Sequence, residues 1–298
     1  MIRNSLGGLL VACVLGLVAA TPAQALLEDN LSSLSEEQTV GYLSPLVGGL
    51  SGSLNSGIFR SGHVPTTGLS LTLDVKAAYM AFSDDDRLWT TPATGGYESV
   101  DAPTVIGNTE AVTADHQTVG GLQFTYPGGF DMSNFGVAVP QLTIGNVAGT
   151  RAMVRYISLS LGDEDVGDLK FFGIGGQHSI SQYLPGVPVD LAFGIMYQSL
   201  ELGDGVVDAS ALALNVTGSK RLGTGPVSLE PYLGVGLDSF TMDAKYDSGD
   251  DEITAEFDRA NDGHLTLGTG INLPGVKLHA EYSVAAVSGF AGGVSFGI

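Results

Sequence analysis

The feature that most constrains the fold is a two-residue alternation of apolar and polar side chains that runs from Gly68 to the end of the chain. In the segment 275–286, one face would carry Val276, Leu278, Ala280, Tyr282 and Val284, and the other Lys277, His279, Glu281 and Ser283. A period of two is typical of β-strands with one apolar face. About ten such strands are predicted: 68–82, 137–144, 150–161, 167–179, 188–201, 207–221, 226–246, 252–273, 275–286 and 289–298. A soluble β-sandwich alternates in the same way, so the alternation alone does not choose the architecture.

The connections between these strands fall into two classes that alternate strictly along the chain. One class contains no acid: 145–149, 180–187, 222–225 and 274–275. The other is mostly acidic and includes one long loop: 83–136, 162–166, 202–206, 247–251 and 287–288. In an up-and-down barrel, alternate connections lie at opposite rims, whereas a Greek-key sandwich gives no reason for this order. Outer-membrane barrels have short periplasmic turns and longer external loops.

The predicted fold class is therefore all-β: a transmembrane up-and-down antiparallel β-barrel with an acidic external rim and a neutral periplasmic rim. We expect 10–12 strands, because segments such as 118–126 could add to the ten. The barrel would occupy 68–298, with 83–136 as its long external loop.

The N-terminal residues 1–25 read as a signal peptide. Arg3 precedes an apolar run from Leu6 to Ala20, and Ala23-Gln24-Ala25 is a small-x-small cleavage site. The predicted location is the cell outer membrane, reached by export. Cys13 is the single cysteine of the chain, so the exported part would contain neither disulfides nor cysteine zinc ligands.

Residues 26–67 follow a different pattern. Ser35 and Gln38 are spaced as a capping box. The apolar residues that follow recur at helical spacing: Val40, Leu43, Val47, Leu50 and Leu54. We expect an amphipathic helix over 35–54, broken by Pro45 and the Gly pairs, and then a Gly-rich link. This segment is predicted to plug the lumen or to lie on the periplasmic side, while a leader helix packed on a soluble core stays open.

Charge and hydropathy restrict the partners. The net charge of −20 argues against nucleic acid as a ligand. Yet 44% of residues are hydrophobic and only 15% charged, and no run after the signal approaches the ~18–20 apolar residues of a spanning helix. The expected partners are outer-membrane lipid and lipopolysaccharide, together with the barrel-assembly machinery, whose C-terminal strand signal the ending "AGGVSFGI" partly resembles.

Four segments resemble a bacterial family of predicted outer-membrane β-barrel-like proteins of unknown function. They are "YLSPLVGGLSGSLNSG" (42–57), "PQLTIGNVAGTRAMVRY" (140–156), "FFGIGGQHSISQYLP" (171–185) and "PVDLAFGIMYQ" (188–198). The resemblance covers roughly 40–290. It implies an exported barrel and supplies no activity or catalytic residues.

Charged residues on the polar strand faces are the candidates for the lumen. Those predicted to face it are Lys76, Lys277, His279 and Glu281. They could set the selectivity of a pore or bind one another and close it. Arg151 and Arg155 lie in a strand whose pattern changes face near Tyr156, so the alternation does not assign these two side chains to one face.

The acidic loops offer weak metal ligands. The candidates are Asp84, Asp85, Asp86, Asp163, Glu164, Asp165, Asp250 and Asp251. Oxygen-rich flexible loops suit Ca²⁺, but none of these matches an EF-hand loop. A solvated acidic rim is the favoured interpretation, with no cofactor beyond loosely bound Ca²⁺.

An enzyme is the least favoured class. His178 stands beside Ser179 and near Ser181, as a lipid hydrolase would require. Adjacent strand residues point to opposite faces, so His178 and Ser179 should not meet. The leading hypothesis is a passive channel or transporter for a small or apolar solute. The alternative hypothesis is a closed structural or surface-interaction barrel without transport. A lipid-modifying enzyme is the third and least favoured hypothesis.

Overall fold

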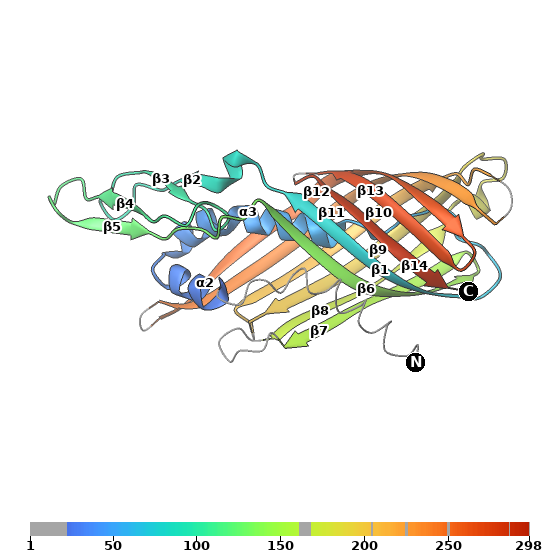
Figure 1. Cartoon of the computed structure of the whole chain (residues 1–298), viewed down its shortest axis with the longest axis horizontal. Coiled ribbons are helices and arrows are strands. Elements are labelled where there is room, and N and C mark those ends of the chain that lie inside the picture. Colours follow the sequence, from blue (N-terminus) through green and yellow to red (C-terminus); the bar gives the residue numbers. More distant parts are fainter. Residues whose placement is uncertain are drawn as a thin grey trace, which may run out of the picture.

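A computed structural model describes residues 23–160, 168–203, 205–223, 226–248, 251–285 and 287–297. Ten antiparallel strands form a closed barrel (Figure 1). Each barrel strand pairs with the barrel strands that come before and after it in the chain, and the last strand, β14, pairs with the first, β1. The strands are β1 (Ser70–Ala81), β6 (Asn134–Val147), β7 (Thr150–Ser160), β8 (Asp168–Ser179), β9 (Asp190–Leu202), β10 (Val207–Ser219), β11 (Ser228–Ser248), β12 (Asp251–Leu273), β13 (Val276–Val284) and β14 (Gly289–Gly297). The predicted fold class and the ten predicted strands are confirmed.

The additional strands that would have made twelve are not part of the wall. Gln123–Tyr126 forms β5, which pairs with β4 (Val112–Asp115) in a small hairpin outside the barrel. A second hairpin joins β2 (Leu88–Thr90) and β3 (Asp101–Pro103). Both belong to the long connection between β1 and β6, which extends beyond the acidic rim (Figure 1). The twelve-strand alternative is wrong because β1 pairs directly with β6 and leaves no free edge.

The two faces of the wall differ in chemistry. In β1, Leu71 and Tyr79 are 48% and 47% exposed on the outside, while Asp74 and Lys76 are buried on the inside. The other strands repeat the outer pattern, with half-exposed apolar side chains facing outward. Their inner side chains are mostly polar toward the neutral rim and mostly apolar toward the acidic rim, where Phe240, Met242 and Phe257 are buried. The outer side chains include Ile144, Phe172, Ile195, Val235, Leu267, Leu278 and Phe290. The barrel is therefore apolar where a soluble protein would be polar.

In the described residues before the barrel, the chain forms the helices α2 (Ala23–Ser32) and α3 (Glu36–Asn55). Ser35 caps α3, and its backbone N–H donates to Gln38 Oε1 at 2.9 Å, which completes the predicted capping box. The break expected at Pro45 is wrong, because α3 is continuous over 20 residues. Contacts with β1, β6, β10, β11 and β12 surround the helix. This tertiary packing outweighs the cost of about 3 kcal/mol for an interior proline.

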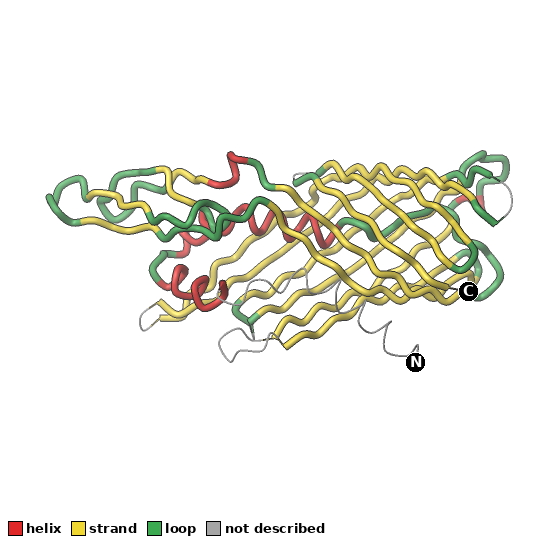
Figure 2. Tube along the Cα trace, in the orientation of Figure 1, coloured by secondary structure: helices red, strands yellow, loops and turns green. Residues whose placement is uncertain are grey.

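The helix enters the barrel from the acidic rim, and the chain then passes through to the neutral rim (Figure 2). Small residues on α3 allow the wall to approach: a Cβ added at Gly52 would lie 3.0 Å from Met80 Sδ, and one at Gly49 would lie 2.9 Å from Phe82 Cζ. Further along, the Ala148 N–H donates to Thr66 O at 3.1 Å, close to the turn where β6 meets β7. The helix thus lies inside the wall at the acidic end, and not beneath the neutral rim.

The acidic end of the barrel is capped by an apolar cluster. Leu34, Tyr42 and Leu43 of the N-terminal region pack with residues of the long connection and of β11, among them Ile106 and Phe240. Tyr42 donates to Gly128 O at 2.9 Å and accepts from Asn30 Nδ2 at 3.0 Å. Burial raises the pKa of Tyr42 to about 12, against the opposing effect of the Asn30 hydrogen bond. We call this cluster, with α2 and the hairpins β2–β3 and β4–β5, the cap.

None of the helices in the described part of the chain is both long and apolar enough to cross a membrane.

Candidate functional site in the barrel lumen

Residues 56–69, here called the luminal segment, cross the lumen between α3 and β1. Near their start, Lys76 of β1 and Glu281 of β13 approach the same stretch of backbone. Lys76 Nζ donates to Gly57 O and, at 2.7 Å, to Ile58 O, while the Gly57 N–H donates to Glu281 Oε1 at 2.7 Å. Tyr232 also donates to Glu281 Oε2 at 2.7 Å. Two opposite charges from the wall therefore hold one turn of the chain.

Gly57 is suited to this turn. Its φ of +68° lies in the left-handed region that favours glycine, and an added Cβ would approach Ala291 Cβ at 3.3 Å.

Arg155 of β7 holds the C-terminal end of α3 in place through a glutamine side chain. Its guanidinium donates to Gln198 Oε1 at 2.7 Å and to Gln141 Oε1 at 2.9 Å. Gln198 in turn donates to Leu54 O at 2.6 Å. The last turn of α3 is thus bound through a neutral amide that a buried arginine orients.

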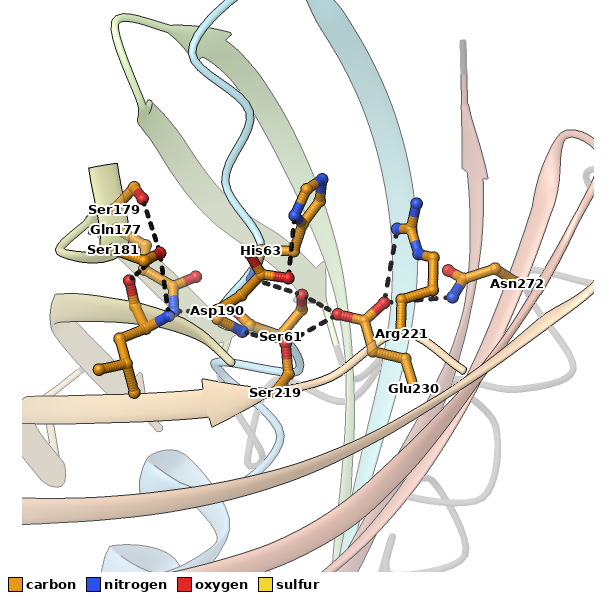
Figure 3. A network of polar contacts seen from close by, with 12 residues as sticks. Ser61, His63, Gln177, Ser179, Ser181, Asp190, Ser219, Arg221, Glu230 and Asn272 are labelled. Atoms are coloured by element: carbon orange, nitrogen blue, oxygen red, sulfur yellow. Dashed lines mark hydrogen bonds and ion pairs between the residues drawn. The ribbon is translucent and has the colours of Figure 1, made fainter. Parts of the chain in front are cut away.

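Glu230 of β11 is the centre of a second cluster, which Figure 3 shows from close by. It lies near the neutral rim, because β11 begins at Ser228. Its carboxylate accepts hydrogen bonds from Ser61 Oγ, from Ser219 Oγ at 3.0 Å and from Asn272 Nδ2 at 3.1 Å. Arg221 Nη2 lies 3.5 Å from the same carboxylate. Although Glu230 is only 4% exposed, four groups from the wall and the luminal segment compensate its charge.

The backbone of the luminal segment near Ser61 is held by further hydrogen bonds from the wall. Ser61 O accepts from Arg151 Nη2 at 2.8 Å and from Gln177 Nε2 at 3.0 Å. The next residue, Gly62, donates its N–H to Ser219 Oγ at 3.0 Å, and a Cβ there would clash with Asp190 O. His63 Nδ1 lies 3.1 Å from the carboxylate of Asp190, as Figure 3 shows.

The predicted lumen-facing residues divide between two places. Lys76 and Glu281 are buried on the inner face and meet at Gly57. Lys277 and His279 lie on the same strand as Glu281 and line a cavity nearer the neutral rim. A two-residue spacing indicates that these side chains share a face, but it does not say which partners they meet.

Sequence reasoning missed the role of several luminal residues. Glu230 stood on a polar face without being singled out, and Arg60 lay in the link, where no period assigns a face. Arg60 Nη2 lies 3.5 Å from Asp74 Oδ1, a buried carboxylate of β1. Arg151 and Arg155 point inward in alternation with outward residues, so the expected change of face near Tyr156 does not occur. The apolar Met153 lies between them on the inner face, which concealed the pattern.

The predicted metal ligands are not assembled into a site in the described part of the chain. Asp84, Asp85 and Asp86 lie in a short exposed turn, in which Asp86 accepts from the Ser83 N–H at 2.8 Å and from its hydroxyl at 2.7 Å. Among the described residues, no three His, Cys, Asp or Glu side chains are placed to share a metal ion. Several predictions concern residues outside the described ranges: residues 1–22 of the signal peptide predicted over 1–25, Asp163, Glu164, Asp165, Asp250 and the side chain of Asp251.

His178 does not bind either nearby serine. Its ring contacts Thr150 Oγ1 at 2.8 Å, Gln182 Nε2 at 2.8 Å and Tyr183 OH at 3.0 Å. Ser179 and Ser181 instead lie 3.4 Å from each other through their hydroxyls. The histidine and the serines are therefore engaged separately.

Comparison with known proteins identifies the family. The model of a family described as "Family of unknown function (DUF6588)" matches residues 3–298. The chain belongs to this family. The resemblance found from the sequence is thereby confirmed, and the family description carries no activity. No curated protein matches the chain.

Solved barrels are similar only at low identity. The chain matches the outer membrane protease OmpT from Escherichia coli at 8% identity and a TM-score of 0.32, over 77% of this chain and 95% of that one. It matches LpxR from Salmonella typhimurium at 9% identity and a TM-score of 0.34, over 76% of this chain and 99% of that one. It matches the translocator domain of the autotransporter NalP from Neisseria meningitidis at 13% identity and a TM-score of 0.24, over 87% of this chain and 98% of that one. At TM-scores this low, the matches say nothing about what the DUF6588 chain does.

Proposed function

We propose that this DUF6588 protein is an outer-membrane barrel whose lumen is closed by its own N-terminal segment. The closed wall suits a bilayer because every strand finds a hydrogen-bonding neighbour and no edge is left unpaired. The half-exposed apolar side chains all around the outside would be costly in water but favourable against lipid. Lipid and lipopolysaccharide are thus the expected surroundings.

The orientation follows from the two rims. The neutral turns between β6 and β7 and between β12 and β13 are short, whereas the long connection carries the cap at the opposite end. Short periplasmic turns and longer outer loops are typical of bacterial outer-membrane barrels. The cap and the acidic rim would therefore face outward.

The observation that carries closure is the binding of the luminal segment at successive levels. Lys76 and Glu281 hold Gly57, and Glu230 and Arg151 hold Ser61 from opposite sides. A barrel of ten strands has a narrow lumen to begin with, since eight strands already fill with side chains. Each hydrogen bond to a charged group typically contributes about 1.5–3 kcal/mol, and several would be lost together, so the segment should not leave spontaneously.

We infer that the protein acts as a closed barrel presenting its cap at the cell surface, in preference to a permanently open pore. Passive passage of a small solute, the leading expectation from the sequence, would need the luminal segment to move first. A lipid-modifying activity finds no support in the contacts of His178. Overexpression should accordingly leave the mass spectra of lipid A and phospholipids unchanged.

Planar-bilayer recording tests the closure. The wild-type protein should give no steady conductance above that of empty bilayers. The double variant Glu230→Gln/Arg151→Gln, which weakens both sides of the Ser61 site, should give frequent openings. Lys245→Gln is the matched control, because Lys245 pairs with Asp208 on the acidic side of the wall and does not contact the luminal segment.

A cysteine probe separates closure from misfolding. The chain has one cysteine, Cys13, in the predicted signal peptide. Ser53 of α3 is only 4% exposed and does not line the cavities near the rims. Ser53→Cys would supply the single thiol of the exported protein, and this thiol should resist a membrane-impermeant maleimide while the barrel stays folded. Steady wild-type conductance, or rapid labelling of Ser53→Cys in the folded barrel, would overturn the proposal.

A further inference from the structure

The basic residues of this acidic chain are unevenly distributed. The chain has 12 Lys and Arg against 32 Asp and Glu. Four of the twelve line one cavity of about 310 Å³ near the neutral rim: Arg60, Arg151, Arg221 and Lys277. Of the described residues that line it, Glu230 is the one acid. The cavity therefore has the opposite charge from the molecule as a whole.

Two of these four bases form no direct ion pair with a carboxylate in the described part of the chain. Arg60 is paired with Asp74, and Arg221 with Glu230. Arg151 instead binds the neutral Ser61 carbonyl and Gln177. Lys277 forms no hydrogen bond or ion pair with any residue in the described ranges. Unpaired positive charge in a partly enclosed space is unfavourable unless an anion joins it.

His279 provides a second, independent indication. It is only 6% exposed, it lines the same cavity, and both ring nitrogens lack a hydrogen-bond partner among the described residues. It lies two residues from Lys277 on β13, so the two side chains share the inner face. A buried imidazole without partners is uncommon and calls for an explanation such as a missing ligand.

We propose that this cavity binds a small polyanionic solute carrying phosphate or carboxylate groups. Arg151 and Lys277 supply the unpaired charge, and the His279 ring N–H supplies a neutral donor. Glu230 does not oppose this role, because Ser61, Ser219, Asn272 and Arg221 already engage its carboxylate. Guanidinium and ammonium groups are the usual ligands of such oxyanions.

The size and place of the cavity narrow the ligand further. A volume of about 310 Å³ is at the small end of the range for small-molecule sites. Its lining includes Gly275, in the neutral turn between β12 and β13, and Ser70, which pairs with Gly145 at the start of the neutral turn between β6 and β7. In the proposed orientation the ligand would come from the periplasm. The site exists in the closed barrel, so it goes beyond the proposed function and does not require conduction.

Isothermal titration calorimetry of the folded barrel in detergent tests the site. Pyrophosphate and citrate serve as probes, each at constant ionic strength set with sodium chloride. We expect at least one of them to bind with a saturable heat, and the one that binds tells whether phosphate or carboxylate groups are preferred. Lys277→Gln should weaken that binding about tenfold, the effect of losing one partly screened charge contact.

Lys220→Gln is the matched control. Lys220 is an exposed base at the same rim, next to Arg221, and it does not line the cavity. Its loss should change the dissociation constant by less than about twofold, as expected of a screened surface charge. His279→Leu, which removes the unpartnered donor with little change in volume, should also weaken binding.

The melting temperature of each variant is measured first, and variants that match the wild type are compared in binding. Weaker binding by Lys277→Gln and His279→Leu, with Lys220→Gln unchanged, supports the site. The proposal is overturned if neither anion binds above the chloride blank, or if Lys220→Gln weakens binding as much as Lys277→Gln. Because the calorimetry needs no conductance, its failure is distinguishable from failure of the closed-barrel proposal.

Discussion

The two halves of the N-terminal region are held inside the barrel by different forces. At the acidic end, α3 packs through apolar residues such as Leu43 and through glycines that approach the wall. At the neutral end, the luminal segment is extended, and charged side chains hold its backbone. The helix satisfies its own backbone groups and needs only apolar contacts, whereas an extended segment must find hydrogen-bond partners in the wall. The polar inner face of the strands is where those partners lie.

The largest effect should come from breaking the charge site at Gly57. Glu281→Ala removes one of the two carboxylates near the buried Lys76 and leaves the Gly57 N–H and the Tyr232 hydroxyl without their acceptor. It should lower the free energy of unfolding by about 3–5 kcal/mol. Urea titration of the barrel in lipid vesicles measures this. The double variant Lys76→Met/Glu281→Gln should cost less than the sum of its single variants, and simple additivity would contradict the coupling.

An apolar deletion in the cap should cost nearly as much but have a different consequence. Leu43→Ala removes a side chain that is 1% exposed and should cost about 2–5 kcal/mol. We expect faster proteolysis of the long connection, while the luminal segment stays bound and conductance stays absent. If Leu43→Ala opened the barrel to ions as readily as Glu281→Ala, the two halves would not be held independently.

Overpacking tests the small face of α3. Gly52→Leu places a side chain against Met80 and the Val287 carbonyl and should cost about 1–3 kcal/mol. Gly120→Leu is the control, because a Cβ at Gly120 meets nothing within 4 Å and its backbone is not in the left-handed region. Equal midpoints of denaturation for the wild type and Gly52→Leu would mean that α3 is free to shift within the barrel.

The smallest effect concerns the start of α3. Ser35→Ala removes one half of the capping box and should cost about 1 kcal/mol. Gln38→Ala should cost a similar amount and also breaks the hydrogen bond to the Tyr126 hydroxyl, which links the helix to the long connection. A thermal melt of the cap, followed by the fluorescence of Trp89, would reveal both losses. Ser33→Ala, in the exposed turn between α2 and α3, should leave that melt nearly unchanged.

The sequence by itself determined the wall. A period of two assigns each strand residue to the inside or the outside, so the ten strands and the inward direction of Lys76 and Glu281 follow from local order. The capping box placed the start of α3 at the correct residue for the same reason, since all of its contacts lie within four positions.

Only the tertiary structure decided what occupies the lumen. Which inner residues meet depends on the stagger between strands and on the path of the luminal segment, and neither has a local signal. Ser61 meets Glu230 across 169 positions, and Gly57 meets Glu281 across 224. The glycines that looked like helix breakers are what let α3 fit against the wall, because their small size matters only once a neighbour is present. The closed lumen and the basic cavity beside it thus arise from contacts that no periodicity records.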